Sequence, residues 1–158
     1  MGFKRNDWSM KKVILILAMG LLFCGSANSE SLKPLSEYVE ENQDNSDDPA
    51  FMFYITTRCA SNYSFGATLF LNKGLEVESK NFQDISVKLK VVATKLLTNK
   101  SGYTNDEAVK AVLENTEDIY DRYIKDGKEH YSKTGSYING SYIEDDLSIC
   151  KKLNKTIF

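Results

Sequence analysis

Histidine, proline and cysteine are scarce in this sequence, with one, two and three residues among 158. A catalytic cysteine needs a neighbouring base and a zinc site needs three or four clustered ligands, which His130 and the cysteines do not supply. The sequence also lacks a C-x-x-C pair, a glycine-rich phosphate loop, G-x-S-x-G, H-E-x-x-H and internal repeats. We therefore expect no catalytic residues, no metal and no cofactor, and a protein that acts by binding.

Long apolar runs are limited to residues 13–23, and these 11 residues are too few to cross a bilayer, which needs about 20. Positive charge at residues 10–12 precedes the run, and small or polar residues follow it. These features are the three parts of a secretory signal peptide. Because Ala27 and Ser29 fit the small-x-small cleavage rule, we predict that residues 1–29 are removed and that no membrane-spanning segment remains.

Two points about this leader stay open. A bacterial lipoprotein signal needs a small residue immediately before its cysteine, so the bulky Phe23 before Cys24 makes lipid anchoring the weaker alternative. The chain starts at either Met1 or Met10, since the second gives a short leader that begins with Met-Lys-Lys. A leader of that form is typical of bacteria, and we expect a periplasmic or secreted protein.

Excess positive charge is absent. The whole sequence has 20 basic and 22 acidic residues, and the 129 residues after the leader have 16 and 21, a net charge of −5. An acidic chain without a basic stripe is a poor match for nucleic acid or an anionic membrane surface. The length fits one domain with a modest core.

Two cysteines remain once the leader is removed, Cys59 and Cys150. An even pair in an exported chain favours a disulfide, because oxidising compartments form and keep such bonds. The loop that they would close holds 92 residues. On chain-entropy grounds, closing a loop of this size contributes about 4.5 kcal/mol to stability.

The apolar pattern predicts an all-α fold, a small up-down bundle of about four helices. Residues 30–48 are expected to form a short helix and an acidic, flexible linker, and residues 49–158 a single helical domain. Asp48 and Pro49 are typical of a helix start. The helix that follows, to about residue 71, has a stripe at helical spacing that consists of Phe51, Ile55, Cys59, Tyr63, Gly66 and Phe70.

Three more helices are expected after residue 71. Apolar spacing predicts one over residues 82–97. Thr104 and Glu107 form a capping box that starts the next helix, which we expect to end near Gly127. A looser region then leads to a second capping box, Ser141 and Glu144, which starts the last helix.

In an up-down bundle the first and last of these four helices are antiparallel, so a Cys59–Cys150 bridge would clamp them side by side. Asp146 precedes Cys150 by four residues and Tyr63 follows Cys59 by four, so each shares the helix face of its cysteine. We therefore predict that Tyr63 and Asp146 form a buried polar pair.

Other charged groups have simple structural interpretations. The acidic residues 144–146 lie in the first turn of a predicted helix, where acids interact favourably with the helix dipole. Arg58 is expected to pair with an acid on a helix surface. His130 is expected to lie in a solvent-exposed loop.

The function that we predict is binding to an envelope or secreted protein, as an inhibitor, immunity factor or chaperone-like accessory protein. The alternative is a carrier of a small apolar ligand, with a pocket between helices near Phe51, Phe70, Phe82 and Tyr123. A third hypothesis is an enzyme, which would require Asp146, Tyr63 and His130 to meet in one open cleft.

Overall fold

The structure, a computed structural model, describes residues 31–45 and 47–158. The predicted leader, residues 1–29, lies outside the described residues, as do Cys24 and the two candidate starts, Met1 and Met10. Residues Ser31–Phe158 form one compact unit.

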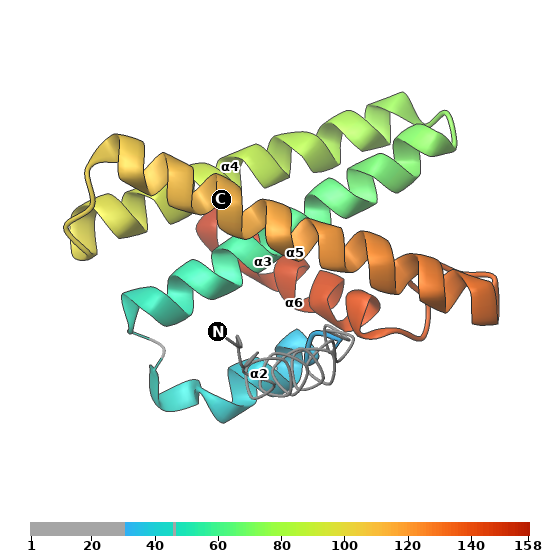
Figure 1. Cartoon of the computed structure of the whole chain (residues 1–158), viewed down its shortest axis with the longest axis horizontal. Helices are drawn as coiled ribbons and strands as arrows, with labels where there is room; N and C mark the ends of the chain where they lie inside the picture. The colour runs from blue at the N-terminus through green and yellow to red at the C-terminus, as the bar shows by residue number, and fades with distance from the viewer. Residues whose placement is uncertain (1–30, 46) are drawn as a thin grey trace, which may run out of the picture. The chain divides into compact units, whose positions relative to one another are not determined.

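The fold is all-α throughout the described residues, as predicted. Its helices are α2 (Leu35–Glu41), α3 (Pro49–Asn72), α4 (Glu76–Lys100), α5 (Asn105–Thr134) and α6 (Tyr142–Ile157), with a 3-10 turn at Gln43–Asn45. Successive helices from α3 to α6 reverse direction (Figure 1). The described part has five α-helices rather than about four, because the short α2 packs against α6 and joins the bundle.

Local signals set the starts of α3 and α5. The Asp48 side chain caps α3 by accepting a hydrogen bond from Ala50 N at 2.9 Å, and Pro49 occupies the first turn. The predicted capping box of α5 is present: Glu107 N donates to Thr104 Oγ1, and Thr104 N donates to Glu107 Oε2 at 2.9 Å.

The second predicted capping box, at the start of α6, is only half formed. The Ser141 side chain accepts a hydrogen bond from Ile143 N. The Glu144 carboxylate, however, accepts from Gly140 N at 2.8 Å rather than from the cap residue. The hydroxyl therefore caps the helix, and the glutamate holds the preceding loop.

Two helices are longer than the apolar spacing predicted. α4 begins at Glu76 rather than Phe82, because Glu76 and Glu78 lie in its first turn and favour the helix dipole, and Ser79 Oγ donates to Ala67 O at 2.9 Å. α5 continues through Gly127 to Thr134, so much of the predicted looser region is helical.

Gly127 is inside α5 because α3 approaches it closely. A Cβ atom at this position would lie 2.8 Å from Phe65 Cζ. The helix ends instead at Gly135, whose φ of 76° is in the left-handed region that glycine adopts without strain. One glycine thus permits close helix packing, and the other ends the helix.

α3 is the central helix of the described unit and contacts α4, α5 and α6. Every residue from 55 to 63 is buried, not only those of the predicted stripe. Its polar residues are compatible with burial because they donate to carbonyl groups: Thr56 to Met52 O, Ser61 to Thr116 O and Asn62 to Ile143 O.

Candidate functional site

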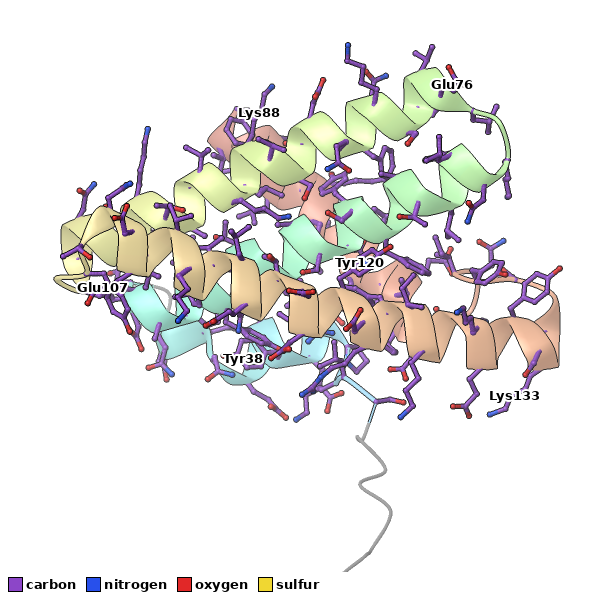
Figure 2. All side chains as sticks on the ribbon, turned by 45° about the horizontal axis from the view of Figure 1, so that its top comes forward. Tyr38, Glu76, Lys88, Glu107, Tyr120 and Lys133 are labelled. Carbon is purple, nitrogen blue, oxygen red and sulfur yellow. A yellow bond between two sulfur atoms is a disulfide. The ribbon has the colours of Figure 1, made fainter. Side chains whose placement is uncertain are left out.

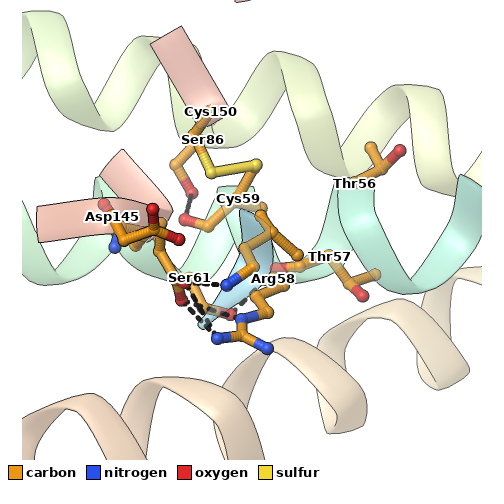
Figure 3. Close-up of a disulfide and its surroundings, with 12 residues drawn as sticks. Thr56, Thr57, Arg58, Cys59, Ser61, Ser86, Asp145 and Cys150 are labelled. Carbon is orange, nitrogen blue, oxygen red and sulfur yellow. Dashed lines mark hydrogen bonds and ion pairs between the residues drawn. A yellow bond between two sulfur atoms is a disulfide. The ribbon is translucent and has the colours of Figure 1, made fainter. Parts of the chain in front are cut away.

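The disulfide predicted between Cys59 and Cys150 is present and joins α3 to α6 (Figure 3). The Sγ–Sγ distance is 2.02 Å and the Cα–Cα distance is 5.2 Å. Both side chains are fully buried, at 0 % exposure. These cysteines therefore have a structural role as a clamp between the first and last long helices.

A fully buried ion pair lies next to the disulfide. Arg58 Nε donates to Asp146 Oδ2 at 2.8 Å, and Nη2 donates to Asp146 Oδ1 at 2.9 Å. Leu35 N donates to Oδ1 at 2.7 Å, and the Tyr123 hydroxyl donates to Oδ2. Four donor groups therefore surround this carboxylate, which is how a buried charge is accommodated.

The rest of the Arg58 guanidinium is also enclosed. Nη1 donates to the Tyr54 hydroxyl at 2.9 Å, and Nη2 donates to Lys33 O. The guanidinium carbon lies 5.8 Å from the ring centre of Tyr54 and 5.9 Å from that of Tyr142, within cation–π range. The sequence predicts that Arg58 pairs with an acid on a helix surface, but its partner is buried.

The enclosure of Arg58, Asp146 and Tyr123 shifts the pKa values of all three side chains. Burial raises the pKa of Asp146, although Arg58 and the Tyr123 hydroxyl oppose the shift. Burial lowers the pKa of Arg58, but its interactions with Tyr123 and Asp146 bring that pKa above its ordinary value. Burial also raises the pKa of Tyr123 well above its ordinary value. The network thus favours a neutral Tyr123 and a charged Arg58.

The structure gives Asp146 different partners from the predicted Tyr63. The Tyr63 ring packs edge-on against Phe82, with 5.2 Å between ring centres. Arg58 and Tyr63 are five residues apart, which places them about 140° apart around a helix of 3.6 residues per turn. Asp146 contacts the side of α3 that carries Arg58. The sequence contains one signal for the correct partner of Asp146, because Arg58 is the only charged residue of α3.

The acidic start of α6 also caps α2. Pro34 precedes α2 and offers no side-chain cap. Asp146 accepts from Leu35 N at 2.7 Å, and Asp145 Oδ2 accepts from Ser36 N at 2.9 Å. The carboxylates thus satisfy two amide groups that a helix start leaves without partners. Besides their position at the start of α6, which the sequence predicts, Asp145 and Asp146 therefore act as a tertiary cap for α2.

The residues of the enzyme hypothesis lie in different surroundings. Asp146 is enclosed by Arg58 and Tyr123, and Tyr63 belongs to the apolar core. His130 lies near the end of α5, with Nε2 2.8 Å from Asn139 O. The geometry therefore gives no support to joint catalysis by these three residues.

The four aromatic residues of the carrier hypothesis pack against other rings. Phe70 and Phe82 meet edge to face with 4.9 Å between centres, and Phe51 stacks on Tyr38. Tyr123 stacks between Phe65 and Tyr142. None of these four aromatic residues lines any of four well-formed surface pockets of the described residues.

Two of these pockets flank the first half of α5. The lateral pocket, of about 440 Å³, lies among α3, α4 and α5 and is lined in part by Thr68, Lys90, Leu113, Glu117 and Tyr120. The end pocket, of about 550 Å³, lies where α3 begins and α4 ends. Figure 2 shows α5 running from Glu107 toward Lys133, with Tyr120 on the side that faces α3.

The solvent-facing side of α5 over residues 106–121, between these pockets, is named the α5 ridge. It carries six acidic residues and one basic residue, Lys110. Val109 and Leu113, one helical turn apart, are 40 % and 52 % exposed. The ridge therefore combines negative charge with exposed apolar side chains.

Comparison with known proteins gives no further information about this disulfide-clamped helical bundle. No protein-family model, curated protein or solved structure matches the chain. Among residues 31–45 and 47–158, none of the helices is both long enough and apolar enough to span a membrane.

Proposed function

We propose that this is an exported protein that binds another envelope or secreted protein through the α5 ridge. The observation that carries the proposal is the pairing of exposed Val109 and Leu113 with four exposed acids, Glu114, Glu117, Asp118 and Asp121, between two pockets. Scattered exposed apolar residues are normal, but exposed apolar side chains that are rimmed by polar groups are typical of protein-binding surfaces.

The internal architecture supports binding by a rigid surface. The disulfide and the Arg58–Asp146 network hold α3 to α6, and α5 joins this network through the Tyr123 hydroxyl. A surface that is already ordered loses less conformational entropy when a partner binds. This property fits an inhibitor, an immunity factor or an accessory protein.

Export is supported by two independent features. The leader pattern of residues 1–29 is that of a signal peptide. The buried Cys59–Cys150 bond belongs to a type that persists in oxidising compartments and is rare in the cytosol. An intact-mass measurement on the protein recovered from the envelope fraction, with and without reduction, tests both features.

Site-specific photo-crosslinking tests the binding surface. A photo-reactive amino acid replaces Leu113 or Glu117 on the ridge, and the matched controls are Val77 and Asp84 on α4, which are also exposed. We expect one discrete crosslinked species from the ridge positions and none from the controls. A ridge substitution, Val109→Glu, should abolish that species without changing the melting temperature.

Equal crosslinking from ridge and control positions would contradict the proposal, as would crosslinks that survive Val109→Glu. The carrier alternative receives no support from the packing of its four aromatic residues.

A further inference from the structure

The end pocket contains an unusual acceptor. Asn115 lines this pocket, and its Oδ1 atom is buried without a hydrogen-bond partner. It is the one buried side-chain oxygen or nitrogen without a partner in the described residues. A carbonyl oxygen that is buried without a partner destabilises the protein, so a donor group that reached it would gain a hydrogen bond.

The walls of the end pocket are apolar. Phe53 comes from the first turns of α3, Leu97 from the end of α4, and Ala111 from α5. Tyr103, which is 45 % exposed, lines the same pocket from the loop between α4 and α5. A ligand with an apolar chain and a planar end group would fit such walls. The aromatic ring of Tyr103 would favour an end group that is cationic.

The rim of the end pocket is acidic. Glu114 and Asp118 are one helical turn apart on α5, and both line the pocket. Glu114 has one recorded ionic partner, Lys110, at 3.8 Å, and both side chains of that pair are mostly exposed. An exposed pair of this kind contributes little, so a better-placed cation can replace Lys110.

We infer that the end pocket binds an arginine side chain of the partner protein. This inference rests on the proposed function and specifies the chemistry of the partner. The three methylene groups of arginine match the apolar walls, and its five N–H donors suit two carboxylates and the Asn115 oxygen. Lysine has a compact ammonium group rather than a planar fork of donors, so it suits several separate acceptors less well.

The charge of the surrounding surface agrees with this assignment. The α5 ridge, which borders the pocket, carries six acids and one base, so a basic segment of the partner would be attracted to it. The arginine would enter the pocket as an anchor at one edge of a larger interface.

The direct test uses N-acetyl-arginine methylamide as the probe and the isosteric, neutral N-acetyl-citrulline methylamide as its control. Amide and methyl chemical shifts of the exported protein are followed by NMR during titration with each compound. We expect the arginine compound to shift signals of Asn115, Ala111 and Leu97. The citrulline compound should bind at least about tenfold more weakly, since its hydrogen bonds lack the charge.

Variants separate the end pocket from the rest of the acidic surface. Asn115→Leu removes the acceptor that has no partner, so the melting temperature should not fall, while the probe should bind several-fold more weakly. Glu114→Gln with Asp118→Asn should weaken binding of the arginine compound alone. The control Asp84→Asn, on the exposed face of α4, should leave the titration unchanged.

Equal affinity for the two compounds would overturn the inference, as would equal binding by wild type and the Asn115 variant. Its failure is distinguishable from that of the proposed function. Ridge crosslinks without probe binding would reject the arginine site alone. Probe binding without ridge crosslinks would reject the α5 ridge as the partner surface and leave the pocket assignment in place.

Discussion

Arg58 and Asp146, which are 88 residues apart in the sequence, form an ion pair in which both side chains have 0 % exposure. Arg58 is adjacent in sequence to Cys59, and Asp146 is one helical turn before Cys150. The covalent and ionic links between α3 and α6 therefore lie at neighbouring positions on both helices. Because Leu35 N of α2 and the Tyr123 hydroxyl of α5 also donate to Asp146, four helices meet at one carboxylate.

Removal of one partner of this ion pair should be strongly destabilising. We expect Arg58→Met to lower the free energy of unfolding by about 3–5 kcal/mol, because it leaves a buried carboxylate without its counter-charge. The double variant Arg58→Met with Asp146→Leu should recover only part of that loss, because it removes the unpaired charge but leaves Leu35 N and the Tyr123 hydroxyl without their acceptor. Urea denaturation measures both, and the exposed pair Lys133–Glu129 is the control, for which Lys133→Met should change stability by less than about 1 kcal/mol.

Loss of the disulfide should be destabilising without changing the fold. We expect Cys59→Ala with Cys150→Ala to lower the free energy of unfolding by about 2–5 kcal/mol, since the bridge closes a long loop. Because both sulfur atoms are buried, reduction of the native protein should be slow and should accelerate in urea. Rapid alkylation of the native, unreduced protein would contradict the bond.

Local sequence signals were sufficient for part of this fold. Asp48 with Pro49 and Thr104 with Glu107 define helix starts through hydrogen bonds to residues two to three positions away. The disulfide followed from the cysteine count and the export signal. Each of these features depends on few residues, so it can be read without knowledge of the packing.

The features that were missed depend on which neighbours a residue meets. In the sequence, Gly127 cannot be told apart from a glycine that ends a helix. Only its close approach to Phe65 shows that it lies inside α5 and permits helix packing. Tyr63 shares the face of Cys59, but Asp146 meets the adjacent face of α3, which carries Arg58. A helix that is buried on all sides makes every face a candidate, so periodicity alone cannot select the partner.

Gly127 should tolerate no side chain. We expect Gly127→Ala to destabilise the protein by about 1–3 kcal/mol, because the added methyl would lie 2.8 Å from Phe65 Cζ and would have to displace that ring. The control is the adjacent exposed position, where Lys128→Ala should change stability by less than about 0.5 kcal/mol. Thermal denaturation compares the two. A gain in stability for Gly127→Ala, as expected from helix propensity alone, would contradict the packing.

The cap that α6 provides should hold the start of α2. We expect Asp145→Ala to weaken the first turn of α2 by about 1 kcal/mol, because Ser36 N loses its acceptor. Amide hydrogen exchange at Ser36 should then be about fivefold faster, while exchange in the middle of α3 should not change. The control Asp84→Ala should leave Ser36 unaffected. Unchanged exchange at Ser36 in the Asp145 variant would show that α2 does not depend on this cap.

Alkaline pH should unfold the protein, because burial raises the pKa of Tyr38, Tyr63, Tyr123 and Tyr142. In the unfolded chain a tyrosine loses its proton at about pH 10, whereas the folded state holds these four in the neutral form. Above that pH the unfolded state binds fewer protons, so the free energy of unfolding should fall as pH rises and should be fully retained below it.

A titration that follows phenolate absorbance and far-ultraviolet circular dichroism together tests this expectation. The buried tyrosines should ionise only in the step in which helix content is lost, and Tyr123→Phe should remove part of that step. This variant also loses the hydrogen bond to Asp146, so its stability near neutral pH should be lower than that of the wild type. Ionisation of all nine tyrosines at about pH 10 with helix content intact would contradict the burial of these hydroxyl groups.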